Sequence, residues 1–188
     1  MRNLKRALSL ALAAIMLIGM MVVSASAASY NDLTDKDQIV NKDAVSMLVS
    51  LGIIEGKPDG SYAPTENVDR AQMAKMLSVI MNKGVDNSAL YQSVNSGLVD
   101  VNTNWAKGHI NYCYTTGIIA GRGNGKFDPD AGVTGSEAAK MLLVALGYNP
   151  TYEGIGGATW QITTDVLANQ AGLYDELDGM NTSAPLTR

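Results

Sequence analysis

Apolar residues recur at helical spacing in two stretches of the chain that are near copies of each other. In both stretches a hydrophobic side chain returns every three or four residues, which is typical of an amphipathic helix. The repeated positions are Met73, Met76, Leu77 and Ile80 in the first stretch and Ala138, Met141, Leu142 and Ala145 in the second. Each stretch follows a capping-box pair, Asp69 with Gln72 in the first and Thr134 with Glu137 in the second. We therefore expect a helix to begin directly after each cap, the first over 70–81.

An earlier helix is predicted in each copy. In the first copy it covers about 37–51 and carries an apolar stripe, formed by Val40, Ala44, Met47, Leu48 and Leu51. Gly52 follows this helix, and Gly117 follows the corresponding helix of the second copy. A glycine after an apolar helical run suits the left-handed conformation that ends many helices. We therefore expect both helices to end at these glycines.

The segment 52–77 aligns with 117–142 without a gap. Between the glycine and the second helix, each copy has a glycine-rich turn followed by an aromatic residue, one further residue and proline (Tyr62 to Pro64, Phe127 to Pro129). This order predicts a short extended segment in the loop. Repetition at a fixed period indicates small units that share a core. The unit is helix, loop, helix, and the predicted fold class is mainly α.

A third, degenerate unit begins at about residue 151. Trp160 precedes Gly172 by the same interval that separates Trp105 from Gly117. The chain stops at Arg188, the first residue of the predicted second helix of this unit. The third unit is therefore incomplete, and we expect a downstream part.

The segment 1–27 has the features of a secretory signal peptide. A basic head precedes an apolar run of about 17 residues, and Ala25-Ser26-Ala27 gives a cleavage pattern. The run is short for a membrane span, so we predict a secreted protein with no membrane contact after cleavage. The predicted organisation is a signal peptide over 1–27, then repeats over 28–84, 85–150 (with a linker) and 151–188.

Charge and composition argue against several functional classes for this protein. After signal cleavage the chain keeps 11 basic and 18 acidic residues, a formal charge of −7. An acidic protein without a basic cluster is a poor nucleic-acid ligand. Cys113, the single cysteine, excludes an internal disulfide framework and is predicted to be a buried small hydrophobe. His109 is the only histidine, so we predict no metal site around it.

The order of residues in each repeat points to a family. The second copy carries Asp100, Trp105, Gly117-Ile118-Ile119, Gly121, Gly125, Phe127, Pro129 and Val133-Thr134-Gly135-Ser136-Glu137. The first copy carries Gly52-Ile53-Ile54, Gly56, Gly60, Tyr62, Pro64 and Val68-Asp69-Arg70-Ala71-Gln72. With these elements the repeats resemble S-layer homology (SLH) modules, over essentially the whole chain after the signal peptide.

This resemblance implies three modules that form one pseudo-threefold, mainly helical domain. It also implies that a secreted protein is held noncovalently at the bacterial cell wall or cell surface. The implied ligand is secondary cell wall polysaccharide, often pyruvylated, bound in grooves between modules, and self-assembly into a surface layer is a further expectation. The family's Thr-Arg-Ala-Glu arginine is associated with the acidic sugar. By position that role falls to Arg70 and Arg188, whereas the second module has Gly135, and Asp69 and Gln72 replace the threonine and glutamate in the first.

The candidate glycan-binding residues are Arg70, Asp69, Arg188, Thr187, Trp105, Trp160 and Gly125. A cation in the first turn of a helix opposes the helix dipole by about 0.3–1 kcal/mol, so Arg70 is poorly placed for stability alone. A carboxylate bound there would meet free backbone N–H groups and a guanidinium together. The sequence leaves open that Arg70 pairs with Asp69 or Glu66 instead, and that the tryptophans pack against the protein.

Other functional classes find little support in the sequence. It contains no HExxH or Gly-x-Ser-x-Gly motif, so we predict no enzymatic activity and no cofactor. A carboxylate pair for glycoside hydrolysis stays open among the 18 acidic residues. The loop around Asp128 and Asp130 lacks the ligand pattern of a calcium hand. As an alternative, the chain is the anchor of an S-layer protein or a wall hydrolase whose main domain lies beyond Arg188.

Overall fold

The computed structural model describes residues 29–177 and 179–188, so the predicted signal peptide lies outside the described residues. Within them the chain is helical, and its strand-like pairing is limited to isolated bridges. The α-helices are α2 (Lys42–Ser50), α3 (Arg70–Met81), α4 (Lys107–Thr115), α5 (Gly135–Ala145) and α6 (Trp160–Gln170), and the 3-10 turns are η1 (Tyr30–Asp32), η2 (Lys36–Gln38) and η3 (Ser88–Tyr91). The mainly α fold class is confirmed. None of the described helices is long and apolar enough to span a membrane.

The predicted helix boundaries follow from local signals. α3 covers the predicted residues 70–81, and both capping boxes are formed, Asp69 with Gln72 and Thr134 with Glu137. The glycines after α2, α4 and α6 have positive φ angles of 69°, 78° and 72°. Glycine adopts this conformation without the strain that a Cβ atom would cause, so it ends each helix.

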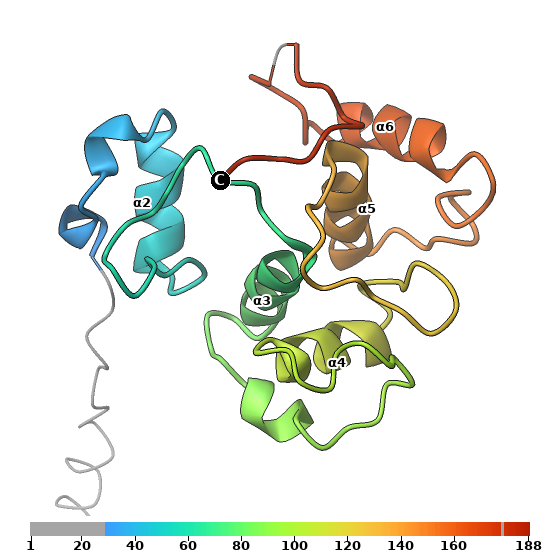
Figure 1. Ribbon diagram of the computed structural model, residues 1–188. Coiled ribbons are helices and arrows are strands. Elements are labelled where there is room, and N and C mark those ends of the chain that lie inside the picture. The colour runs from blue at the N-terminus through green and yellow to red at the C-terminus, as the bar shows by residue number, and fades with distance from the viewer. Residues whose placement is uncertain (1–28, 178) are drawn as a thin grey trace, which may run out of the picture.

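The helices pack in pairs that join neighbouring repeats (Figure 1). α3 packs against α4 and α5 packs against α6, so the second helix of one repeat lies on the first helix of the next. His109 and Cys113 lie one helical turn apart on α4 and are buried, and the Cys113 Sγ atom is 3.4 Å from the Ala74 carbonyl oxygen of α3. Thr164 and Ala168 occupy the matching places on α6 and are also buried. The repeat therefore fixes which helical face is covered.

Three extended segments meet at the centre of the fold. The Val68 N–H donates to the Leu186 carbonyl (2.8 Å), the Leu186 N–H to the Val133 carbonyl (2.9 Å) and the Val133 N–H to the Val68 carbonyl (2.9 Å). Each donor is also an acceptor in this ring, and each segment comes from a different repeat. The closed ring gives the three repeats the expected pseudo-threefold arrangement.

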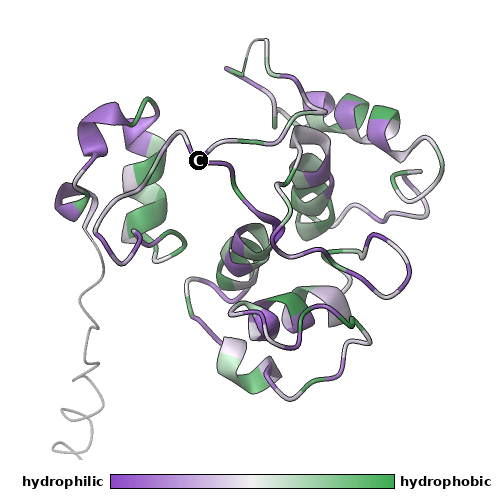
Figure 2. Cartoon of the chain, in the orientation of Figure 1, coloured by the Kyte–Doolittle hydropathy of each residue, from purple (hydrophilic) through white to green (hydrophobic). Residues whose placement is uncertain are grey.

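The buried apolar residues form three clusters. The largest lies around α3, α4 and the second loop and includes Leu77, Ile110 and Phe127. A second cluster surrounds Tyr62 in the first repeat, and a third lies around Leu143 between α5 and α6. Figure 2 shows hydrophobic residues along α5, which contributes to both the first and the third cluster.

α2 begins later than predicted and turns a different face inward. Val45 and Val49 are buried, whereas Val40 is 90% exposed and Met47 62% exposed. The 3-10 turn over Lys36–Gln38 occupies the start of the predicted helix. The stripe predicted for α2 corresponds, repeat for repeat, to the face of α4 that packs against α3. Within the described chain, however, α2 packs mainly on η1. The stripe is therefore left largely uncovered.

The loops also differ from the prediction in one respect. The residue after the aromatic position is left-handed, with φ of 57° at Ala63 and 55° at Asp128, and the extended segments come later, directly before the helix caps. A carboxylate holds each turn. Asp35 accepts the Ala63 N–H at 2.7 Å, and Asp100 accepts the Asp128 N–H at 2.8 Å. These hydrogen bonds offset the strain of a non-glycine residue at positive φ.

Candidate functional site

Two grooves occupy matching places in the repeats. Groove 1, of about 620 Å³, lies between the loop after α2, helix α3 and Trp105. Groove 2, of about 440 Å³, lies between the loop after α4, helix α5 and Trp160. The residues compared below are Ile53, Glu55, Lys57, Gln72, Lys75, Trp105 and Arg188 in groove 1 and Ile118, Ala120, Arg122, Glu137, Lys140, Trp160 and Arg70 in groove 2, in matching order.

Each groove is assembled from all three repeats. In groove 2 the arginine Arg70 comes from the first repeat, Arg122 and Lys140 come from the second, and Trp160 comes from the third. In groove 1 each of these residues comes from the preceding repeat in cyclic order. Its lysines come from the first repeat, its tryptophan Trp105 from the second and its arginine Arg188 from the third. The ring of extended segments makes this possible, because the segments of the first and third repeats lead directly into Arg70 and Arg188.

Arg70 is a buried residue with a full set of partners. Its side chain is 3% exposed. Its Nε donates to the Phe127 carbonyl (2.8 Å), and its Nη2 donates to the Ala120 carbonyl (3.1 Å). The guanidinium also lies 4.4 Å from the centre of the Phe127 ring, a cation–π contact. Arg70 therefore ties the start of α3 to the second loop, and it pairs with neither Asp69 nor Glu66.

Glu137 is the acidic partner of Arg70 and of a second arginine. Its Oε1 lies 3.3 Å from Arg70 Nη1, and its carboxylate accepts two hydrogen bonds from Arg122 Nη2 (2.7 and 2.9 Å). Burial alone would raise the pKa of Glu137. Hydrogen bonds from the Thr134 N–H and from Arg122, together with the charge of Arg70, outweigh burial and lower this pKa. Glu137 therefore stays ionised and neutralises part of the arginine charge.

Groove 1 distributes its charges differently. Gln72 replaces Glu137, so the guanidinium of Arg188 has no carboxylate at that place and donates from Nη1 to the Tyr62 carbonyl at 2.9 Å. The acids near groove 1 engage its lysines instead. Lys57 pairs with Glu66 at 2.7 Å, and Lys75 pairs with Glu55 at 2.6 Å.

An accessible tryptophan borders each groove. Trp105 lines groove 1 and is 56% exposed. In groove 2 the Lys140 ammonium lies 5.1 Å from the centre of the Trp160 ring, and burial lowers the pKa of Lys140. An aromatic face beside a cation suits an acidic sugar, because the ring can cover the apolar face of the sugar while the cation meets its charge.

The structure brings together four of the predicted ligand residues and leaves three outside the grooves. Arg188 lies with Trp105, and Arg70 lies with Trp160. Asp69 caps α3 and pairs with Gly132, Thr187 pairs with Asn67, and Gly125 forms a loop turn with a φ of 69°. Sequence reasoning missed Lys75 and Lys140 as groove residues. Their signal was present, because both lie in the repeated Ala-Lys-Met-Leu segment.

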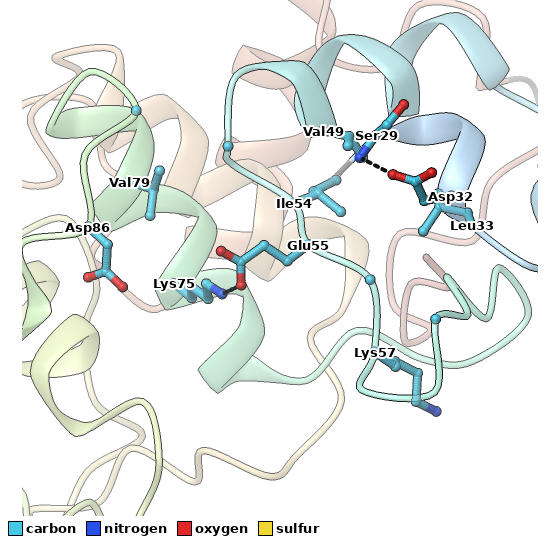
Figure 3. Close-up of a pocket in the computed structure, with 14 residues that line it drawn as sticks. Ser29, Asp32, Leu33, Val49, Ile54, Glu55, Lys57, Lys75, Val79 and Asp86 are labelled. Atoms are coloured by element: carbon cyan, nitrogen blue, oxygen red, sulfur yellow. Dashed lines mark hydrogen bonds and ion pairs between the residues drawn. The ribbon is translucent and has the colours of Figure 1, made fainter. Parts of the chain in front are cut away.

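A side cavity of about 450 Å³ adjoins groove 1 and shares Glu55 and Lys75 with it (Figure 3). Asp86 also lines this cavity, and its carboxylate lies 3.7 Å from His109 Nε2. The His109 Nδ1 atom is 2.6 Å from the Ser78 hydroxyl, which donates to the Lys75 carbonyl. Ser78 is only 4% exposed and does not line the cavity, so its hydroxyl is not placed to reach a substrate there. Within the described residues no group of acidic, histidine and cysteine side chains could hold a metal ion.

The chain is similar to a known family and to several bacterial surface proteins. The model of the S-layer homology domain matches residues 29–74 and 99–139. An S-layer protein of Bacillus licheniformis is 32% identical over 113 residues, which are 60% of this chain and 12% of that protein. A cell surface protein of Thermoanaerobacter kivui is 32% identical over 150 residues, 79% of this chain and 19% of that protein.

A further relative carries the name of an enzyme. A Bacillus anthracis protein named as an uncharacterized cell wall amidase is 29% identical over 96 residues, 51% of this chain and 17% of that protein. In all three comparisons the matched segment spans less than a fifth of the relative's length.

Proposed function

Starting from the premise that the chain belongs to the S-layer homology family, we propose that it anchors a secreted protein noncovalently to the bacterial cell wall. The proposed ligand is an acidic secondary wall polysaccharide held in grooves 1 and 2. The expected cell-surface location is confirmed by the family and by the names of the relatives. Because the matched relatives are much longer than this chain, the protein that it anchors and the partners of that protein belong to the proposal.

The charge of the grooves is the observation that carries this proposal. Groove 1 is lined by Lys57, Lys75 and Arg188 against the acid Glu55, and Glu66, outside the lining, pairs with Lys57. Groove 2 is lined in the same way by three cations, Arg70, Arg122 and Lys140, against Glu137. The whole chain has a formal charge of −4, so basic side chains gather in the grooves against the overall charge. Such a focused positive field attracts an anion even when the net charge does not.

The remaining lining supports a sugar as the carrier of that negative charge. Apolar and aromatic side chains, with isoleucine, methionine and tryptophan in both grooves, form most of the other walls. A pyranose ring presents an apolar face and a polar edge, which match such a wall beside cations. A carboxylated sugar, such as the pyruvylated unit that the family resemblance implies, combines both properties.

Two kinds of protein could use this anchor. The relatives named for the S-layer support an array protein that assembles at the cell surface. The relative named as a cell wall amidase supports a wall hydrolase as the second candidate. We assign no catalytic role to the repeats themselves in either case.

Binding to purified walls tests the proposal. The chain without the segment 1–27 is expected to sediment with walls and to lose that binding when the non-peptidoglycan polymer is removed chemically. Replacing both groove tryptophans, W105A with W160A, is expected to weaken binding by about tenfold or more, as for central aromatic contacts of an interface. Y152A is the matched control, because Tyr152 is 87% exposed and lies in neither groove. Retention that is indifferent to polymer removal would refute the proposed ligand.

A further inference from the structure

The lysine of groove 1, Lys75, forms an ion pair with a carboxylate of the protein itself, that of Glu55. Glu55 Oε2 lies 2.6 Å from Lys75 Nζ. Figure 3 shows the two side chains reaching toward each other, Glu55 from the loop after α2 and Lys75 from α3. Both residues line groove 1, so the ion pair lies where an acidic ligand would place its own carboxylate.

Groove 2 has the same lysine without the acid. Ala120 occupies the place of Glu55 and Lys140 the place of Lys75, and both line groove 2. Among the described residues Lys140 has no carboxylate within ion-pair distance, and its ammonium lies over the ring of Trp160. The acid of groove 2, Glu137, is engaged by two arginines and by the Thr134 N–H. Its carboxylate therefore does not compete for the lysine.

We propose that Glu55 is an internal competitor that sets the affinity of groove 1 for acidic glycans. An acidic sugar must displace the Glu55 carboxylate from Lys75 to bind groove 1, whereas it meets Lys140 directly in groove 2. Groove 2 then fills first, and groove 1 fills at higher ligand concentration. This inference rests on the proposed function, since it concerns the same ligand class.

The exposure of the pair makes displacement feasible. The Glu55 side chain is 62% exposed and that of Lys75 is 22% exposed. Exposed pairs are weak, and the competition corresponds to about two- to fivefold in a binding constant. Glu55 is therefore a modulator of groove 1 and does not close it.

A reciprocal exchange between the grooves tests the competition. W160A leaves groove 1 as the working site, and W105A leaves groove 2. In the W160A background, E55A is expected to tighten binding by about two- to fivefold. In the W105A background, A120E is expected to weaken binding by a similar factor, because it places a carboxylate opposite Lys140. The double variant E55A with A120E keeps the net charge and is expected to reverse the order in which the grooves fill.

The probe is the non-peptidoglycan polysaccharide released from Bacillus licheniformis walls, measured by titration calorimetry beside a carboxyl-reduced sample of the same polymer. E55A is expected to improve binding of the native sample only. E153A is the charge-matched control outside both grooves and is expected to change nothing.

An equal gain with E153A or with the reduced polymer would overturn the inference, because bulk charge would then explain it. A parent protein that binds while E55A has no effect would overturn the competition alone. A parent protein that binds neither sample would overturn the proposed function, and the inference with it.

Discussion

Seam 1, formed by α3, α4 and groove 1, and seam 2, formed by α5, α6 and groove 2, share one backbone plan and differ in where their polar groups lie. In seam 2 the arginine is held by Glu137 and two carbonyls, while the lysine lies over the ring of Trp160. In seam 1 the arginine donates to the Tyr62 carbonyl, Gln72 takes the place of Glu137, and Glu55 engages the lysine. The comparison shows that two repeats can share one backbone geometry while the positions of a few acidic residues differ. These positions determine which cation has a structural role and which one is available to bind a ligand.

The largest expected difference between the seams concerns their arginines. Arg70→Ala should lower the free energy of unfolding by about 3–5 kcal/mol, because it removes two hydrogen bonds that a buried guanidinium donates to the Phe127 and Ala120 carbonyls, each worth about 1.5–3 kcal/mol. Arg188→Ala should cost only about 1 kcal/mol, the worth of one ordinary hydrogen bond. Denaturant unfolding of the two variants measures both values.

Arg70→Lys provides the control for charge alone. Lysine cannot reproduce the forked contacts to the Phe127 and Ala120 carbonyls, so this variant should recover only part of the loss. Equal stability of the R70A and R188A variants would show that the two arginines have the same role.

A smaller difference is expected at the helix caps. Thr134→Ala removes the hydroxyl that accepts the Glu137 N–H at the start of α5 and should cost about 1 kcal/mol. Asp69→Thr transfers the cap of seam 2 to α3 and should change stability by less than about 0.5 kcal/mol, because both residues are good caps. Thermal unfolding of the two variants compares them directly. A cost of D69T as large as that of T134A would mean that the Asp69 carboxylate has a further partner.

The smallest expected effect is the loss of stability of seam 1 when the pH is lowered. Burial lowers the pKa of His109 in seam 1, even though Asp86 favours the charged form. The unfolded chain therefore takes up the proton at a higher pH than the folded chain. The stability from neutral His109 is present above about pH 6.5 and declines as the pH falls below that value.

Thr164 occupies the matching place in seam 2, so His109→Thr should reduce this decline. Between pH 7.5 and pH 5.5, the melting temperature should fall further for the parent than for H109T. The same fall in both proteins would place the acid sensitivity elsewhere.

The sequence was sufficient to predict the parts of the fold that depend on neighbours along the chain. The capping boxes and the glycines after the helices predicted helix boundaries, whereas the pseudo-threefold arrangement was implied by the family resemblance. The partners of Arg70 were not predictable, because Glu137 lies far away along the chain and no local pattern links the two. The inward face of α2 was mistaken because the stripe was assumed to be covered as it is in α4.

The candidate site was predicted in outline only. Both tryptophans and both arginines line the grooves, but the depth of Arg70 and the acids Glu55 and Glu137 depend on how three repeats converge. The recurring lysine was visible in the alignment. Its importance becomes clear only when the two grooves are compared.

The buried thiol between α3 and α4 offers a way to measure local opening of the protein in samples that are too turbid for optical spectroscopy. Cys113 is the only cysteine of the chain and has no exposed surface, and burial raises its pKa to about 12. A thiol reagent at neutral pH can therefore modify it only after the two helices separate. The labelling rate then reports how often seam 1 opens, even in a turbid suspension of cell walls. Slower labelling on walls would show that binding of the polymer stabilises the closed seam, and no attached dye is needed.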